Sequence, residues 1–200
     1  MPEQQRKIAE YRFFLQWVGL NTLATALAVV PGDLVGDQTS YIVGNALTGA
    51  LIGLAHWLLL RHVIAHAHWW VVVHAAGWAI SAAIWEIGQA AGWAVGWVAF
   101  GSVSGALLGL MHWLVLRHTV RGAGWWVLAS AAGWDVGWEL GWVVADAVGH
   151  SISESAAWSV VRIVVWDLTS TTLGLVYGLI TGMVLVVLLR RGTRPAAPPR

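Results

Sequence analysis

Two acidic residues lie one helical turn apart in a segment that is otherwise apolar. Asp135 and Glu139 belong to GWDVGWELGW (133–142), and their spacing places both side chains on one face of a helix. An acidic side chain at the centre of a membrane helix costs roughly 2.5–3.5 kcal/mol by insertion scales, so such residues usually serve as proton relays, cation sites or buried partners. The pair predicts an intramembrane site for a cation or a proton.

Two more charged residues extend this hypothesis. Glu86 lies near the outer end of another apolar segment, and Arg162 is the only basic residue that we expect on the outer side. We expect Glu86 to belong to the acidic site and Arg162 to act as its gate. The alternative is a structural role, in which Asp135 and Glu139 are protonated and hydrogen-bonded to His74 or to a tryptophan indole.

Two histidines could bind a cofactor. His56 and His112 precede a tryptophan in two similar phrases, GALIGLAHWLLLRH (49–62) and GALLGLMHWLVLRH (105–118). Each lies five residues before an arginine, Arg61 or Arg117, which is about 7 Å along the helix at 1.5 Å per residue. We therefore expect the two rings at equal depth. Ligation of a haem by two histidines, or of a pigment, requires such a pair. The alternative is that each ring forms hydrogen bonds near the membrane boundary.

A row of polar side chains recurs at equivalent places in three aligned segments. Asn21, His74 and Ser130 each stand four residues after a tryptophan. Polar side chains within a membrane bundle usually form hydrogen bonds to neighbouring helices. We therefore expect this row to connect helices, and we expect no metal site from it.

The composition places these residues in an integral membrane protein. Apolar residues make up 58% of the 200 residues and charged residues 10%, whereas soluble domains carry about 25% charge. With no cysteine, disulfides and thiol chemistry are excluded. Runs of about 20 apolar residues predict membrane-spanning helices, and we place them at 11–30, 41–60, 69–88, 94–116, 125–145 and 168–189. The first run could instead be a signal peptide, but Trp17 and Asn21 fit the repeat described below.

The basic residues predict the orientation. With six spans, ten of the eleven fall on one side of the membrane, and the positive-inside rule makes that side cytoplasmic. These ten are Arg6, Lys7, Arg12, Arg61, Arg117, Arg121, Arg190, Arg191, Arg194 and Arg200. We expect a multi-pass protein of the bacterial inner membrane with both termini in the cytoplasm. The arginines are dispersed along membrane boundaries, so no nucleic-acid partner is expected.

The repeated phrase predicts an all-α fold of three helical hairpins. Eleven of its fourteen residues agree between the two copies, and GLITGMVLVVLLR (178–190) is a degenerate third copy. A repeated phrase marks a repeated supersecondary unit. The expected divisions are a cytoplasmic segment 1–10, hairpins 11–68, 69–124 and 125–190, and a cytoplasmic tail 191–200.

The third hairpin contains an insertion of about 148–167. Ser155, Ser159 and Arg162 recur there at near-helical spacing among valines. We expect an amphipathic helix on the outer membrane surface. The alternative is an extended sixth span.

Glycines at intervals of four predict close helix packing. They are Gly49 and Gly53, Gly105 and Gly109, Gly178 and Gly182, and the longer set Gly133, Gly137 and Gly141.

The phrases GxxxGxxxWLVLR (105–117) and WWVLASxxGW (125–134) resemble those of Trp-rich repeat membrane proteins found in cyanobacteria and Chloroflexi. The resemblance covers most of 17–190 and implies the hairpin fold without implying an activity. In that family a glutamine usually precedes the first tryptophan of the phrase, where this chain has His56 and His112.

Two classes of function stay open. The first is binding or transport of a small solute, a cation or a proton through the acidic site. The second is an accessory subunit of a membrane complex or a homo-oligomer, with glycine faces packed on partners and a haem or pigment held by His56 and His112. We expect no enzyme, because GSVSG (101–105) lacks the first glycine of the rhomboid GxSG motif and the last span has no histidine to act as a base.

Overall fold

The computed structural model describes residues 3–90, 97–149 and 158–191, and all its elements in these ranges are helices. They are α1 (Glu3–Gln38), α2 (Tyr41–Leu60), α3 (Trp69–Ala90), α4 (Trp97–Leu116), α5 (Trp125–Gly149) and α6 (Trp158–Arg190). Four of them, α1, α2, α3 and the Ile163–Arg190 part of α6, are long and apolar enough to cross a membrane. The prediction of an all-α chain with several potential membrane spans is confirmed.

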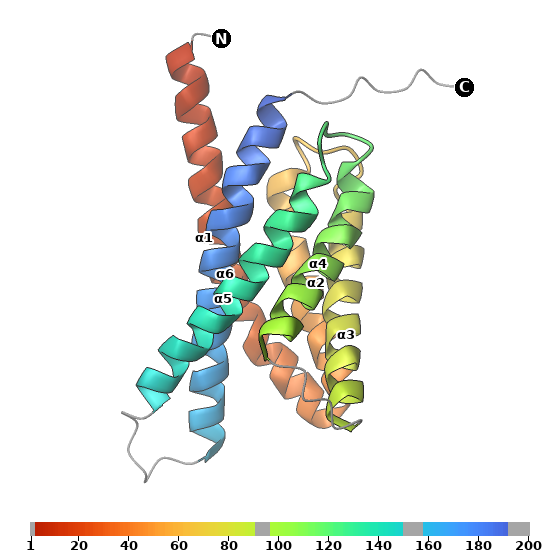
Figure 1. Ribbon diagram of the computed structural model, residues 1–200, viewed down its shortest axis with the longest axis vertical. Coiled ribbons are helices and arrows are strands. Elements are labelled where there is room, and N and C mark those ends of the chain that lie inside the picture. Colours follow the sequence, from red (N-terminus) through yellow and green to blue (C-terminus); the bar gives the residue numbers. More distant parts are fainter. Residues whose placement is uncertain (1–2, 91–96, 150–157, 192–200) are drawn as a thin grey trace, which may run out of the picture.

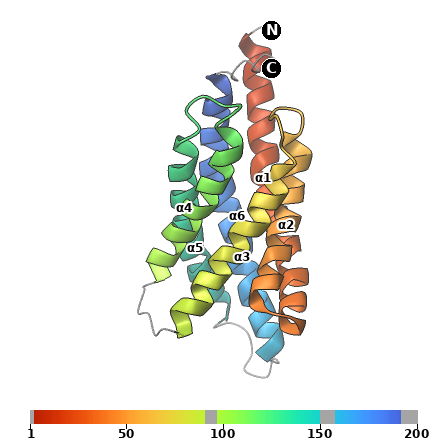
Figure 2. The ribbon, with the colours of Figure 1, turned by 90° about the vertical axis from the view of Figure 1, so that its right-hand side faces the viewer.

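The helices form a closed ring. Each packs against the next along the chain, and α6 packs against α1. Figures 1 and 2 show the start of α1 and the end of α6 at the same end of the bundle, together with the α2–α3 and α4–α5 connections. We call this the basic end, because it carries Arg6, Lys7, Arg12, Arg61, Arg117, Arg121, Arg190 and Arg191. The opposite, acidic end carries Asp33, Asp37, Glu86, Asp146 and Asp167.

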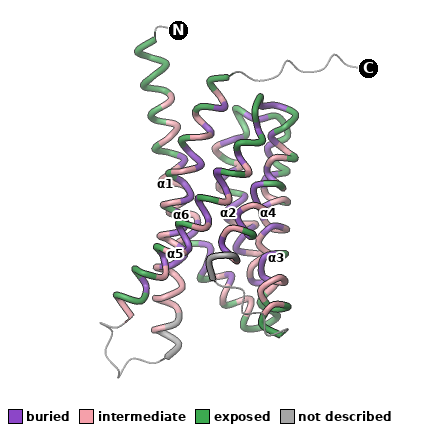
Figure 3. Tube along the Cα trace, viewed as in Figure 1, coloured by how far each residue is buried: buried purple, intermediate pink, exposed green. Residues whose placement is uncertain are grey.

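Buried positions lie along the inner sides of the helices and exposed ones at the outside and the ends (Figure 3). Many exposed side chains are large and apolar, among them Leu27 at 75% exposed and Val143 at 65%. A protein in water would place such side chains inside. An apolar exterior around hydrogen-bonded helices suits a lipid environment.

The glycines of the repeated phrase lie against the backbone of the following helix. A Cβ added to Gly49 would lie 2.7 Å from the carbonyl oxygen of His74 on α3. A Cβ added to Gly105 would lie 2.6 Å from the carbonyl oxygen of Ser130 on α5. Only glycine permits this approach, and Gly53 and Gly109 one turn later make the same kind of contact. The repeated phrase therefore packs α2 on α3 and α4 on α5.

The third copy of the phrase makes the equivalent contact with the first helix of the chain. A Cβ on Gly178 would lie 3.1 Å from Cα of Val18, and one on Gly182 would lie 2.9 Å from Cδ1 of Trp17. This contact between α6 and α1 closes the ring. The remaining glycines of the predicted set, Gly133, Gly137 and Gly141, lie against α6. All nine glycines thus pack against another helix of the same chain.

Replacing Gly109 by leucine is expected to disrupt the α4–α5 contact. An added Cβ there would lie 2.7 Å from Cβ of Ser130 and 2.9 Å from Cα of Val127, and overpacking of this kind costs about 1–3 kcal/mol or more. The matched control is Gly19→Leu, because a Cβ at Gly19 meets no atom within 4 Å. Thermal melting in detergent should show a lower midpoint for Gly109→Leu alone. Equal midpoints would show that the glycine face is not a packing contact.

The predicted surface helix is wrong over its described part. The helix α6 runs without interruption from Trp158 to Arg190. The reason is that residues 158–173 contain no glycine or proline to end a helix. The continuous helix agrees with the alternative interpretation, in which the last apolar helix extends toward its N-terminal side. Ser155 and the side chains of Ser159 and Arg162 lie outside the described residues.

The predicted N-terminal segment is continuous with the first helix, because α1 already begins at Glu3. An ion pair joins it to the last helix, with Arg190 Nη2 placed 2.6 Å from Glu10 Oε2. Residues 3–10 are thus helical, and Glu10 lies beside the end of α6.

Candidate functional site

Three tryptophans at equivalent repeat positions meet inside the bundle. Trp17, Trp70 and Trp126 come from α1, α3 and α5, and all three are fully buried. Their ring centroids lie 5.8–6.4 Å apart, and each pair is edge to face. This is the geometry that aromatic rings prefer. The first helix of each sequence repeat thus supplies one ring to a common centre.

Histidines from the second helices pack on these tryptophans. The His56 ring stacks on Trp17 at 4.6 Å between centroids, and the His112 ring stacks on Trp70 at 4.3 Å. His74 lies against both histidines, at 5.1 Å from His56 and 4.9 Å from His112. We call these six side chains, His56, His74, His112, Trp17, Trp70 and Trp126, the Trp–His layer.

Hydrogen bonds fix the orientation of His56. Trp70 Nε1 donates to His56 Nδ1 at 3.2 Å, so Nδ1 is an acceptor. The proton of the neutral ring is then on Nε2, which donates to Asn21 Oδ1 at 3.1 Å. Asn21 in turn donates to the carbonyl oxygen of Trp17 at 2.8 Å. The chain of bonds joins α1, α2 and α3.

The polar row takes part in these contacts between helices. Asn21 accepts from His56 of α2, and His74 Nδ1 shares a hydrogen bond with His112 Nε2 of α4 at 2.9 Å. Ser130 Oγ shares one with Tyr177 Oη of α6 at 3.2 Å. Each member of the row therefore connects the first helix of a repeat to the second.

Trp126 does not repeat the hydrogen bond that Trp70 donates to a histidine. Trp126 Nε1 and His112 Nδ1 have no hydrogen-bond partner among the described residues. Their ring centroids lie 6.2 Å apart, against 6.4 Å for the bonded pair Trp70 and His56.

A haem or pigment does not fit at His56 and His112. Both nitrogens of His56 are engaged in hydrogen bonds, and its face is covered by Trp17. The His112 ring lies between Trp70 and His74, at 4.3 and 4.9 Å. The rings as packed leave no space for a macrocycle between them, so the structure does not support the proposed ligand pair. Within the described residues, no group of three or more acidic or histidine side chains could hold a metal ion.

An apolar cluster closes the bundle between the Trp–His layer and the basic end. Its buried members besides the tryptophans are Leu60, Ile64, Ala67, Leu116, Val120, Ala123, Leu185 and Leu188. Leu185 stands where the other two repeats have His56 and His112. The third repeat therefore contributes an apolar side chain where the others contribute an imidazole.

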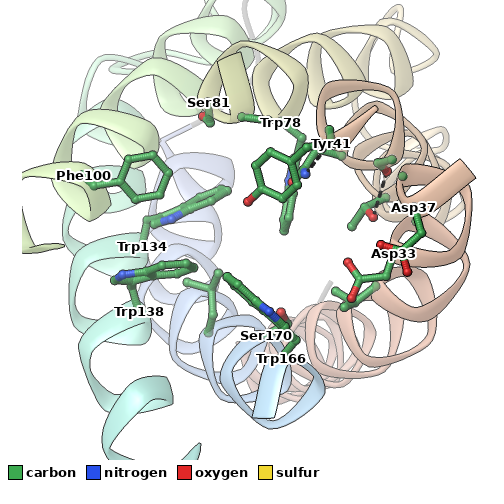
Figure 4. Close-up of a pocket in the computed structure, with 18 residues that line it drawn as sticks. Asp33, Asp37, Tyr41, Trp78, Ser81, Phe100, Trp134, Trp138, Trp166 and Ser170 are labelled. Atoms are coloured by element: carbon green, nitrogen blue, oxygen red, sulfur yellow. Dashed lines mark hydrogen bonds between the residues drawn. The ribbon is translucent and has the colours of Figure 1, made fainter. Parts of the chain in front are cut away.

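A cavity of about 160 Å³ lies on the acidic side of the layer. Residues from all six helices line it, namely Val29, Gly32, Asp33, Gly36, Asp37, Tyr41, Gly44, Asn45, Thr48, Trp78, Ser81, Ala82, Phe100, Trp134, Trp138, Trp166, Ser170 and Leu173. Figure 4 shows Phe100, Trp134 and Trp138 on one side and Asp33 and Asp37 on the opposite side. The cavity thus has an aromatic wall facing an acidic wall.

A smaller space separates the cavity from the Trp–His layer. It has a volume of about 20 Å³ and polar lining groups from Asn21, Thr25, His74 and Tyr177. A polar space of roughly 10–15 Å³ or more can hold one water molecule. Asn21 and His74 of the polar row therefore lie beneath the cavity.

The acidic pair that the sequence singled out does not line the cavity. Asp135 Oδ1 accepts a hydrogen bond from Ser102 Oγ of α4 at 2.9 Å, and Glu139 Oε1 is buried without a partner among the described residues. Trp134 and Trp138, one residue earlier in each case, line it instead. One residue turns a helix by about 100°, so the Asp135 carboxylate faces α4 rather than the bundle centre. The two residues therefore do not form the base of this cavity, and the Asp135 bond goes to Ser102 rather than to His74 or an indole, the partners that the alternative interpretation expected.

The other predicted members of the acidic site lie apart from it. Glu86 is exposed near the end of α3 and borders a separate groove with Tyr41, Trp85 and Trp166. Arg162 belongs to α6, but its side chain lies outside the described residues, so its role as a gate stays a prediction.

Sequence reasoning missed Asp33 and Asp37 as cavity residues. Their spacing of four within DLVGD (33–37) was the available signal, since it places both on one helix face. The expected end of the first span at residue 30 put them beyond the membrane. The helix instead continues through Pro31 to Gln38 and carries both carboxylates to the cavity.

The fold and the site define a class: an all-helical protein, with several helices able to cross a membrane, whose ring of helices encloses a cavity above a buried Trp–His layer. No family model, curated protein or solved structure matches the chain.

Proposed function

We propose that the chain crosses the bacterial inner membrane six times as three repeated hairpins, with the basic end in the cytoplasm. The position of both helical termini and most basic residues at one end supports this topology. Arg61 lies 5.6 Å from the Trp57 ring and Arg117 lies 5.1 Å from the Trp113 ring. Such pairs suit the boundary between lipid and water.

The topology predicts the location of reporter domains fused to the chain. Fusions after Arg121 and after Arg194 are expected to report the cytoplasm, and a fusion after Glu154 the exterior. Paired alkaline phosphatase and fluorescent protein fusions measure this. A cytoplasmic signal at Glu154 would contradict the six-span topology.

We propose further that the protein binds a small solute in the cavity and that the solute enters from the acidic, outer end. The observation that carries this proposal is a cavity lined by all six helices and closed below by the Trp–His layer. Apolar cavities of about 150 Å³ hold a molecule as large as benzene. The cavity of about 160 Å³ thus has room for a ligand of that size. Transport would require the Trp–His layer to open.

An accessory role in a membrane complex has less support. That role relied on glycine faces for partners and on two histidine ligands for a cofactor. The glycines contact helices of the same chain, and the histidine rings are packed in the Trp–His layer. Solute binding is therefore the function we favour.

Filling the cavity is expected to abolish solute binding. The solutes are benzyl alcohol, benzoate and benzylammonium, which match in size and differ in charge, and binding is measured by tryptophan fluorescence and thermal shift. At least one should bind the parent protein saturably, and Ser81→Phe or Ser170→Phe, on two cavity walls, should remove that binding. The control is Ala83→Phe, because Ala83 lies on the same helix outside the cavity lining.

Melting curves without solute identify which variants are folded. Absence of binding by the parent protein to all three solutes, or unchanged binding in folded Ser81→Phe and Ser170→Phe, would contradict solute binding in this cavity.

A further inference from the structure

We infer that the ligand of this cavity is a small uncharged compound with a carbonyl or ether oxygen, which accepts hydrogen bonds from the buried cavity wall on α3 and α5. This inference rests on the proposed function, because it names the chemical class of the solute. Three features of the cavity indicate this class: unbonded donors in its wall, aromatic neighbours around them, and no basic side chain in the described lining.

Four buried polar groups of the cavity wall lack a hydrogen-bond partner among the described residues. They are Trp78 Nε1 and Ser81 Oγ on α3, and Trp134 Nε1 and Trp138 Nε1 on α5. Figure 4 shows the four side chains around the cavity. Ser81 and Trp134 are each 5% exposed, and Trp138 is 7% exposed. Buried polar groups are normally bonded, so the wall has hydrogen bonds to offer to an occupant.

The indole groups determine which kind of hydrogen bond is missing. An indole N–H group can only donate, whereas a serine hydroxyl can donate or accept. Three of the four unbonded groups therefore require an acceptor from the occupant. A carbonyl or ether oxygen supplies an acceptor. A hydrocarbon supplies none, and an ammonium group supplies only further donors.

Trp138 is the indole at which a ligand oxygen fits better than a water molecule. Trp78 and Trp134 also line the smaller polar space, which has room for one water, but Trp138 does not. The Phe100 and Trp166 rings lie 5.6 and 6.1 Å from the Trp138 ring between centroids, and neither offers an acceptor. A buried water needs two to four polar partners. An apolar molecule with one acceptor oxygen needs fewer.

The lining favours an uncharged ligand over an anion, although both accept hydrogen bonds. None of the described lining residues is basic, so a buried carboxylate would lack a counter-charge, which is far more costly than burial of a neutral carbonyl group. Elsewhere in the lining, Asn45 and Thr48 donate to backbone carbonyl oxygens. Asp33 and Asp37 have interaction partners of their own. The unbonded groups on α3 and α5 are therefore left to bind the ligand.

The test compares benzaldehyde and styrene, two uncharged solutes of nearly the same shape, of which only benzaldehyde has an acceptor oxygen. Each is titrated by calorimetry into the purified full-length protein in detergent and amine-free buffer, and the titration into empty micelles is subtracted. We expect benzaldehyde to bind on the order of ten-fold more tightly, as one hydrogen bond to an otherwise unbonded donor predicts.

Variants with phenylalanine in place of tryptophan lose the N–H group and keep an aromatic ring. Trp78→Phe, Trp134→Phe and Trp138→Phe are made singly, and at least one of them should lose the preference for benzaldehyde. The matched control is Trp126→Phe, which should keep the preference. Trp126 Nε1 is also buried and unbonded among the described residues, but Trp126 lies outside the cavity lining.

The outcomes separate the inference from the proposed function. Equal affinities of the two solutes for the parent protein, or tighter binding of styrene, would overturn the inference and leave solute binding standing, and this comparison needs no variant. Retention of the preference in all three folded cavity variants, or its loss in folded Trp126→Phe, would also overturn the inference. Absence of binding by both solutes and by benzyl alcohol, benzoate and benzylammonium would overturn the proposed function itself.

Discussion

His56→Leu is expected to destabilise the protein by about 2–6 kcal/mol. The substitution copies the third repeat, which has Leu185, but it leaves two buried groups without partners: Trp70 Nε1 and Asn21 Oδ1. Each unpaired buried group costs about 1–3 kcal/mol. Unfolding by denaturant in mixed micelles measures the loss against the parent protein.

The matched variant His56→Gln should keep most of that stability. A glutamine amide can accept from Trp70 with its oxygen and donate to Asn21 with its nitrogen, as the imidazole does. If His56→Gln were as unstable as His56→Leu, the two hydrogen bonds would not be the source of the stability.

Trp70→Ala is expected to cost more than truncation of Trp126, the tryptophan at the equivalent position of the next repeat. Removing a fully buried tryptophan costs about 3–5 kcal/mol because of the cavity it leaves. Here the change also leaves His56 Nδ1 unpaired and uncovers the stacked face of His112. Thermal and denaturant unfolding measure the loss.

The repeat provides a matched control in Trp126→Ala. Trp126 is equally buried and equivalent by repeat position, but its Nε1 donates no hydrogen bond to a described residue. Trp70→Ala should therefore be less stable than Trp126→Ala by about 1–3 kcal/mol. A larger loss in Trp126→Ala would contradict the bonding pattern of the layer.

Apolar runs predicted the helix boundaries well next to the two loops at the basic end, residues 61–68 and 117–124. The expected 41–60 coincides with α2, and 69–88 and 125–145 begin where α3 and α5 begin. The ends toward the acidic side were less well predicted, as at Gln38, Gly149 and Trp158. Span length was inferred from bilayer thickness, whereas a helix continues until the chain breaks it. Pro31 did not end α1, in keeping with the tolerance of proline in membrane helices.

The repeat predicted which residues are equivalent, but it did not predict where they point. Equal depth of His56 and His112 followed from the spacing, whereas their contacts with Trp17 and Trp70 depend on the ring of helices closing through α6 and α1. The prediction that Asp135 lines the cavity did not hold for a similar reason. Asp135 differs from Trp134 by one residue, and only packing against α4 decides which of them faces the cavity.

Cysteine labelling tests most directly whether the cavity is open at the outer face and closed at the cytoplasmic face. The chain has no cysteine, so single variants react without background. Asn45 and Ser81 line the cavity, about 6 and 14 Å from the acidic ends of their helices at 1.5 Å per residue, whereas Ser130 is fully buried near the Trp–His layer.

A charged, membrane-impermeant thiol reagent is applied to right-side-out and to inverted vesicles. Asn45→Cys and Ser81→Cys are predicted to react in right-side-out vesicles only, and Ser130→Cys in neither. Reaction of Ser81→Cys in inverted vesicles, or protection of Ser81→Cys on both sides, would contradict a cavity open to the outside above a closed Trp–His layer.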